Sequence, residues 1–143
     1  MISRTLSLRL PKISGLPLLV LLMAASPSVN AQNLVITGVI YGPLSGGIPK
    51  AIELCVLTDI DDLSLYGLGS ANNGGGSDGE EFTFPAGPVS AGTFIHVASE
   101  ETGFSSFFGF APGFTSGSAA GINGDDAIEL FMSGAVVDVF GDI

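Results

Sequence analysis

The sequence contains one cysteine, one histidine and no tryptophan among its 143 residues. Because Cys55 is the only cysteine, no disulfide bond can form within the chain, and stability must come from an apolar core or a bound metal. One histidine and one cysteine are too few for the three or four ligands of a zinc site. A nucleophile–histidine–acid triad would have to use His96, which lies within an apolar run. We therefore expect Cys55 to be buried in a strand, with an interchain disulfide as the alternative, and His96 to have a structural or surface role.

Basic residues are scarce as well, and they are unevenly placed. The chain has four Lys and Arg against fourteen Asp and Glu, and three of the four bases lie within the first 31 residues. All the acids lie after residue 31, so residues 32–143 combine one base, Lys50, with a formal net charge of −13. Nucleic-acid binding depends on Lys and Arg that neutralise phosphates. The composition therefore argues against nucleic acids and anionic membranes as partners, and leaves cations, basic proteins and neutral glycans.

The first 31 residues have the pattern of a secretory signal peptide. Three basic side chains precede an apolar run at residues 16–25, and small residues follow at residues 29–31. The apolar run has about ten residues and contains Pro17, whereas a membrane span needs roughly 20 apolar residues. We predict cleavage after Ala31 and a mature chain of residues 32–143 that is secreted, or periplasmic, without a membrane span. An uncleaved membrane anchor is the alternative.

The mature chain has the pattern of short strands separated by turns. Its apolar segments alternate or are rich in β-branched residues, and Gly, Pro, Asn and Asp separate them. Ser133-Gly134, between the last two segments, is a two-residue hairpin signal. About seven strands of this kind predict an all-β fold, a β-sandwich. The expected strands are residues 34–41, 51–57, 63–68, 81–84, 94–98, 126–132 and 135–140.

The alternation also predicts which side chains form the core, because successive side chains of a strand point to opposite faces. The tetrapeptide Ala-Ile-Glu-Leu occurs twice, at residues 51–54 and 127–130, which suggests two strands with similar roles in one sandwich. The expected core residues are Ile52, Leu54, Phe82, Phe84, Ile95, Val97, Ile128, Leu130, Val137 and Val139.

One short helix is expected after the strand at residues 94–98. Ser99 can cap the free backbone amides, and the two glutamates that follow favour the positive end of the helix dipole. A helix to about Phe108 would place Phe104, Phe107 and Phe108 on one side. Gly109 would end it.

Five segments of the mature chain form an ordered set. They are Leu34-Val35-Ile36-Thr37-Gly38-Val39, Ala51-Ile52-Glu53-Leu54, Asp62-Leu63-Ser64-Leu65-Tyr66-Gly67, Phe82-Thr83-Phe84-Pro85-Ala86-Gly87 and Gly124-Asp125-Asp126-Ala127-Ile128-Glu129-Leu130, the last with Val136-Val137-Asp138 as its hairpin partner. Taken in this order, the segments resemble the lamin-tail domain family, in the type found in bacterial extracellular nuclease-like proteins. The resemblance covers essentially all of the mature chain, with Cys55 where an aromatic residue is frequent and Tyr66 where tryptophan is common.

The resemblance implies an immunoglobulin-like sandwich that acts as an accessory module in secreted nucleases, phosphoesterases and other hydrolases. In such relatives the chain continues beyond the equivalent of Ile143. We therefore expect the sequence to be a fragment, truncated at its C-terminus, with a catalytic domain downstream.

Acidic residues beside a glycine-rich stretch are the candidate metal ligands. Residues 69–79 hold mainly Gly, Ser and Asn, which predicts a long exposed loop, and Asp78, Glu80 and Glu81 lie at its end. Calcium takes six to eight oxygen ligands from carboxylates and carbonyls, and such a loop supplies both. The spacing matches no EF-hand, so the two interpretations are a calcium site at these three residues and a solvated acidic loop.

No catalytic or cofactor-binding residue is expected within residues 32–143, which also lack a phosphate-binding loop of the Walker type. The favoured hypothesis is a secreted, non-catalytic interaction or accessory module that supports or tethers an extracellular hydrolase. Its partner would be a protein or a glycan. The alternatives are the N-terminal fragment of an extracellular nuclease whose catalytic domain is missing here, and a calcium-dependent adhesion module.

Overall fold

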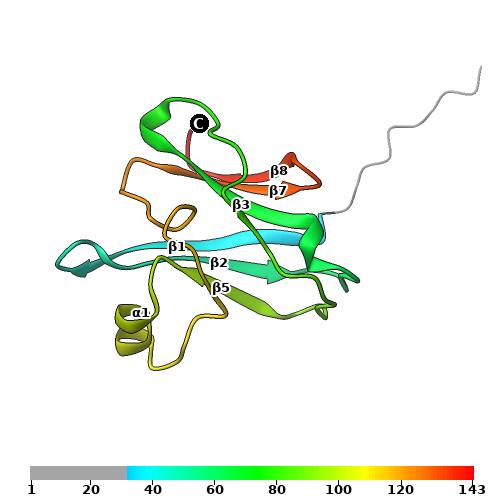
Figure 1. Cartoon of the computed structure of the whole chain (residues 1–143), viewed down its shortest axis with the longest axis horizontal. Coiled ribbons are helices and arrows are strands. Elements are labelled where there is room, and N and C mark those ends of the chain that lie inside the picture. Colours follow the sequence, from blue (N-terminus) through cyan, green and yellow to red (C-terminus); the bar gives the residue numbers. More distant parts are fainter. Residues whose placement is uncertain (1–31) are drawn as a thin grey trace, which may run out of the picture.

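The computed structural model describes residues 32–143, which form a β-sandwich of two four-stranded sheets with one α-helix (Figure 1). The prediction of an all-β sandwich is confirmed for this part of the chain. The predicted signal peptide, residues 1–31, lies outside the described residues. Among the helices of residues 32–143, none is long and apolar enough to cross a membrane.

The first sheet has the strand order β1-β2-β5-β6. Its pairs are antiparallel except that β6 runs parallel to β5. The register of β1 on β2 shifts between Ile36 and Gly38, so Thr37 forms a bulge. The strands are β1 (Leu34–Leu44), β2 (Ile48–Val56), β5 (Phe94–Ala98) and β6 (Phe114–Thr115).

The second sheet is antiparallel throughout, in the order β4-β3-β7-β8. The hairpin predicted at Ser133-Gly134 is present: φ is 51° at Ser133 and 79° at Gly134, as a two-residue type I′ turn requires. The strands are β3 (Tyr66–Ala71), β4 (Phe82–Thr83), β7 (Ala127–Met132) and β8 (Ala135–Phe140).

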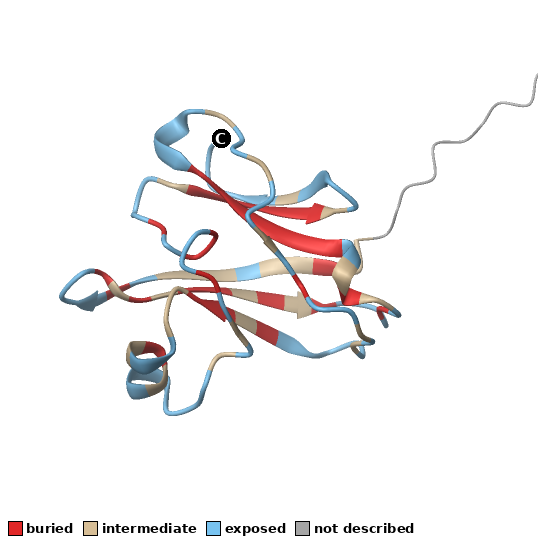
Figure 2. Cartoon of the chain, in the orientation of Figure 1, coloured by how far each residue is buried: buried red, intermediate tan, exposed pale blue. Residues whose placement is uncertain are grey.

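The apolar core lies between the two sheets, and buried residues are concentrated on β3 and β7 (Figure 2). Three aromatic rings meet within it: the ring of Phe84 lies 5.0 Å from that of Phe82 and 5.3 Å from that of Phe114. Removing such side chains from water is the main stabilising term of a fold without disulfides. The expected core residues that lie in or against this core are Ile52, Leu54, Phe82, Phe84, Ile95, Val97, Ile128 and Leu130.

The other two expected core residues, Val137 and Val139, are not buried. Each side chain is 38% exposed. Both lie on β8, which is an edge strand that pairs only with β7. The alternation correctly predicted a strand here, but an edge strand can leave both of its faces in contact with water.

The segment expected as a strand at residues 63–68 is divided into two elements. Leu63–Leu65 is a 3-10 turn, η1, because Oδ1 of Asp62 accepts hydrogen bonds from the backbone N–H and the hydroxyl of Ser64. β3 then begins at Tyr66 and continues to Ala71, where it pairs with Ala127. The first part of the predicted 69–79 loop is therefore a buried strand, and a second 3-10 turn, η2 (Asn72–Gly74), follows it.

The predicted helix is present as α1 (Glu101–Phe108), on the outer face of the first sheet (Figure 1). Its cap is Glu100 instead of Ser99, because the longer carboxylate accepts a 2.8 Å hydrogen bond from the Gly103 N–H. Gly109 ends the helix with φ 80°, as predicted. The rings of the three phenylalanines are neighbours, as expected: that of Phe108 lies 4.7 Å from Phe104 and 5.0 Å from Phe107. Phe104 is buried, whereas Phe107 and Phe108 are exposed.

Candidate functional site

The outer face of the first sheet carries an acid and an imidazole side by side. Glu53 on β2 is in register with Gly38 on β1 and with His96 on β5. Because the neighbouring residues Ile52 and Leu54 point into the core, Glu53 points away from it. Gly38 has no side chain, so nothing from β1 covers the carboxylate at this register position.

Two side chains hold the Glu53 carboxylate in place. The Thr37 hydroxyl, which lies in the β1 bulge, donates a 2.9 Å hydrogen bond to Oε1. Nε2 of His96 lies 3.1 Å from Oε2. The side chain of Glu53 is nevertheless 40% exposed and that of His96 is 24% exposed. The carboxylate is therefore fixed in orientation and still open to a ligand.

The α1 helix and the loop after it build an aromatic wall beside this pair. Phe104 is buried against Ala51 and Ala98 on the outer face of the sheet, and this contact anchors the helix. The ring of Phe108 lies 4.7 Å from that of Phe104, and the ring of Phe110 lies 5.2 Å from His96. Phe108 and Phe110 keep exposed surface, so their rings are available to a bound group.

These elements enclose an open pocket of about 330 Å³. Such a volume is at the lower end of the range for sites that bind small ligands. The walls are mainly apolar, and two polar side chains, Glu53 and His96, converge on the same space. The lining residues are Gly38, Val39, Ile40, Ala51, Ile52, Glu53, His96, Phe104, Phe108 and Phe110.

Within residues 32–143, the hydrogen bonds of the His96 side chain include no Ser, Thr or Cys. Histidine acts in nucleophilic catalysis when it is hydrogen-bonded to a Ser, Thr or Cys nucleophile. Within residues 32–143, the side-chain partner of His96 is Glu53, and the Thr37 hydroxyl donates to Glu53 instead of to His96.

Cys55 lies in the next outward position of β2, in register with Phe94, and is only partly buried, contrary to the expected burial.

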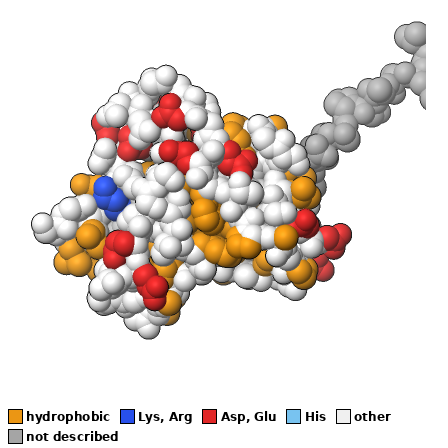
Figure 3. Space-filling model, in the orientation of Figure 1, with side chains coloured by type: hydrophobic (Ala, Val, Ile, Leu, Met, Phe, Trp, Pro, Cys, Tyr) orange, Lys and Arg blue, Asp and Glu red, His pale blue; other side chains and the backbone are white. Residues whose placement is uncertain are grey.

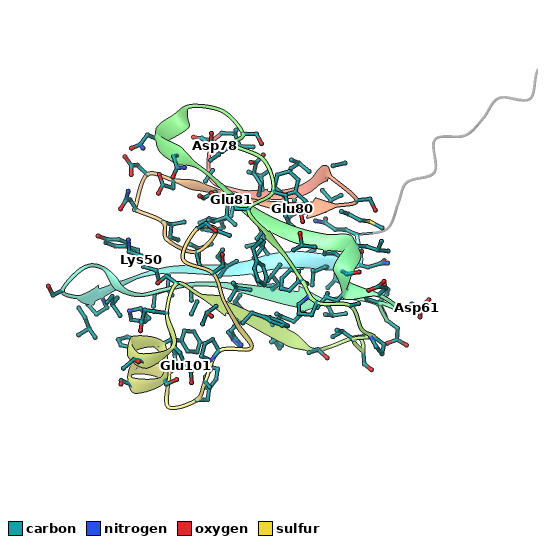
Figure 4. The ribbon with its side chains drawn as sticks, viewed as in Figure 1. Lys50, Asp61, Asp78, Glu80, Glu81 and Glu101 are labelled. Atoms are coloured by element: carbon teal, nitrogen blue, oxygen red, sulfur yellow. The ribbon has the colours of Figure 1, made fainter. Side chains whose placement is uncertain are left out.

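The predicted calcium ligands point to different partners (Figure 4). Asp78 accepts a 2.9 Å hydrogen bond from the Asn72 side chain, and Glu80 accepts one from the Thr83 hydroxyl. Glu81 accepts hydrogen bonds from the backbone N–H and the hydroxyl of Ser70, at 2.9 and 3.0 Å. No three His, Cys, Asp or Glu side chains of residues 32–143 form a group that could hold a metal ion. A calcium ion there would need backbone oxygens as ligands, and the site stays a prediction.

Glu129, on β7, is an acidic residue that is not among the predicted ligands. Its side chain is fully buried; the Ser77 hydroxyl donates a 2.7 Å hydrogen bond to Oε2, and Oε1 has no partner. Glu129 lies in register with Gly69, where an added Cβ would collide with the carbonyl oxygen of Gly79. The glycine-rich loop therefore packs directly on the outer face of the second sheet and covers this carboxylate.

The repeated Ala-Ile-Glu-Leu tetrapeptide was the signal that could have identified both glutamates. It places Glu53 and Glu129 on the outer faces of β2 and β7, one in each sheet. A hydroxyl group donates to each carboxylate, from Thr37 and from Ser77 respectively. The first carboxylate is left open beside an aromatic wall, and the second is sealed beneath a loop.

No family model matches this chain, and neither a curated protein nor a solved structure matches it. The resemblance to the lamin-tail family therefore depends on the five sequence segments alone.

Proposed function

We propose that residues 32–143 form a secreted, non-catalytic interaction module of lamin-tail type. The module binds a partner protein or a glycan and thereby supports or tethers an extracellular hydrolase. The observation that carries this proposal is the open pocket on the outer face of the first sheet, where Glu53 and His96 converge beside exposed aromatic rings.

The exposed rings around the pocket support a role in binding. Phe107, Phe108 and Phe110 are 46%, 39% and 47% exposed, although each has a large apolar surface. Aromatic residues are enriched in protein interfaces, and clustered apolar surface on an otherwise polar protein marks interaction sites. The domain as a whole is strongly acidic, which favours solubility and does not itself require such rings.

The test combines a search for a partner with an assay for hydrolysis. The purified protein, immobilised, is exposed to the extracellular proteins and glycans of its source, beside the variant Phe107→Ser/Phe110→Ser. We expect the native protein to retain a partner that the variant does not retain, and neither to cleave DNA, RNA or a chromogenic phosphodiester. Hydrolysis by the native protein, or equal retention by both proteins, would contradict the proposal.

A calcium-dependent adhesion module is the second candidate, and Glu129 is the observation that favours it. Its Oε1 is buried without a partner beneath the loop that carries Asp78 and Glu80. Carboxylate oxygens without a partner are unfavourable in a protein interior, and calcium with backbone oxygens would satisfy them. Calcium bound at Glu129 would add a second connection between the loop and the second sheet, beside the Ser77 hydrogen bond.

Thermal unfolding with and without calcium tests this candidate. A ligand that binds only the folded state raises Tm with its concentration. Millimolar calcium should raise the Tm of the native protein and should not raise that of Glu129→Gln, and chelation should reduce self-association. An unchanged Tm in the native protein at millimolar calcium removes the candidate.

A further inference from the structure

The pocket on the first sheet has a negative group that no Lys or Arg of residues 32–143 neutralises. Lys50, the only Lys or Arg of residues 32–143, lies over the ring of Tyr41, with Nζ 5.1 Å from the ring centroid, and is no part of the pocket wall. The partner of Glu53 is His96, whose ring carries a charge only when it is protonated. A guanidinium or ammonium group at Glu53 must therefore come from outside residues 32–143.

The carboxylate retains capacity for such a group. An ionised carboxylate offers about four acceptor positions, and Thr37 and His96 use one on each oxygen of Glu53. Both contacts come from the sheet itself, one from β1 and one from β5. The two acceptor positions that remain are on the partly exposed side of the carboxylate, which faces the pocket, and they can accept two further hydrogen bonds.

The aromatic wall suits a cation with an apolar stem. Phe108 and Phe110 lie at the rim of the pocket with exposed ring surface, and Phe110 packs edge-on against His96. Aromatic ring faces attract cations that lie within about 6 Å of the ring centroid. The methylene groups of a long basic side chain would contact Ile40, which lines the pocket and packs against the cluster of Phe104.

We propose that the pocket binds an arginine side chain presented by a basic segment of a partner protein, with its guanidinium group at Glu53 and its plane against Phe108 or Phe110. Arginine fits better than lysine, because its planar guanidinium group pairs with a carboxylate through two hydrogen bonds and stacks on aromatic rings. The inference depends on the proposed interaction function and names the chemistry of the partner.

The charge of the whole domain supports a basic partner. Residues 32–143 carry a formal net charge of −13, and on the face shown in Figure 3 acidic side chains are spread widely while one basic group is visible. Such a field attracts basic segments and accelerates their association. The field alone does not select a site, so a test must separate binding in the pocket from general attraction.

His96 provides the readout, since it is the only histidine of the sequence and lies in the pocket wall. The protein is purified without a histidine tag, so its imidazole gives one pair of ring signals in an NMR spectrum. The probes are the capped tripeptide Gly-Arg-Gly and its analogue with citrulline, which has the same shape without the charge. We expect the arginine peptide to shift the His96 signals saturably, and the citrulline peptide to bind at least about fivefold more weakly.

Three variants separate pocket binding from general attraction. Glu53→Gln should weaken binding of the arginine peptide at least about fivefold, and Phe110→Leu, which keeps the carboxylate, should weaken it about threefold. The control is Asp61→Asn, which removes the same charge at an exposed position at the other end of the molecule (Figure 4) and should leave binding unchanged. Thermal unfolding of each variant confirms that it is folded.

Equal effects of Glu53→Gln and Asp61→Asn, equal binding of the two peptides, or shifts that never saturate would overturn the inference. The proposed function can fail separately. Retention of an extracellular partner without any shift of His96 by the arginine peptide would refute this inference and leave the interaction function standing. Saturable, Glu53-dependent peptide binding without any retained extracellular partner would support the arginine site and contradict the interaction function.

Discussion

Glu53 and Glu129 occupy the same position of a repeated tetrapeptide, but their surroundings differ. Glu53 is open to water beside aromatic rings, whereas Glu129 is fully buried beneath the glycine-rich loop. The sequence gives no indication of this difference, because burial on the outer face of a sheet depends on which distant segment folds over it. The helix α1 leaves a pocket over β2, and the loop leaves no exposed surface over Glu129.

The contact between Ser77 and Glu129 should contribute to stability. Ser77→Ala removes the hydroxyl that bonds to the buried carboxylate and leaves both of its oxygens without a partner. We predict a loss of about 1–3 kcal/mol in the free energy of unfolding, measured by denaturant titration. The control Ser106→Ala, at an exposed position of α1, should cost nothing or stabilise slightly. Equal stability of Ser77→Ala and the native protein would show that the loop does not hold Glu129.

Tyr66 should make the fold sensitive to alkaline pH. Burial raises the pKa of its phenol above the ordinary value of 10.0, and a hydrogen bond with the Asn33 side chain opposes part of this shift. A group with a raised pKa contributes stability that is complete below its unfolded-state pKa and is lost as pH rises through the folded-state pKa. Stability should therefore fall above about pH 10, and less steeply in Tyr66→Phe. If the free energy of unfolding depends on pH in the same way in both proteins, the raised pKa of Tyr66 is contradicted.

At the scale of elements, β7 and β8 show how position in a sheet decides the role of an apolar residue. Both strands are rich in apolar residues, and the turn between them was predicted correctly. β7 lies between two neighbours and has buried side chains on both faces, while β8 lies at the edge and is largely exposed. Unpaired edge strands with apolar residues are the places where a fold invites pairing with another chain.

Leu130→Ala and Val139→Ala should therefore differ strongly. Leu130 is fully buried between the sheets, and its truncation leaves a cavity that should cost about 2–5 kcal/mol. Val139 is more than a third exposed, so its truncation should cost less than about 1 kcal/mol. Chemical denaturation of both variants measures the two values. Similar losses would show that β8 packs into the core as the alternation had predicted.

Local signals predicted most elements, and failed where a local polar contact or a distant strand decided the outcome. Gly109 and Ser133-Gly134 were correctly interpreted because their backbone conformations depend on the residues themselves. Leu63–Leu65 forms a 3-10 turn because Asp62 caps it, and β3 extends through Gly69 because β7 pairs with it. Neither effect changes the apolar periodicity from which strands are predicted.

At the scale of the whole molecule, the candidate pocket was beyond prediction because it is assembled from three separate parts of the chain. The bulge in β1, the centre of β2 and the segment from β5 to Phe110 meet only after the strands have paired. Glu53 and His96 are 43 residues apart, and the sequence shows no spacing that connects them. His96 was expected to be structural or on the surface, and it lies half-buried in the pocket wall.

The strong net charge should make the stability of the domain depend on salt. Residues 32–143 contain one lysine and fourteen acidic residues, so the acidic side chains of the folded domain repel one another. Added salt screens this repulsion. We predict that Tm rises when NaCl is increased from about 10 mM to about 0.5 M. A Tm that falls with salt would mean that attractive ion pairs outweigh the repulsion.

Mapping of the contact surface by hydrogen–deuterium exchange tests the role of the pocket most directly. The exchange of backbone amides is compared in the protein alone and in complex with the partner that it retains. We predict protection at residues 37–41, 94–98 and 101–110, which surround the pocket on the outer face of the first sheet. Protection confined to β8 or to the glycine-rich loop, with these three segments unchanged, would contradict the assignment of the pocket as the binding site.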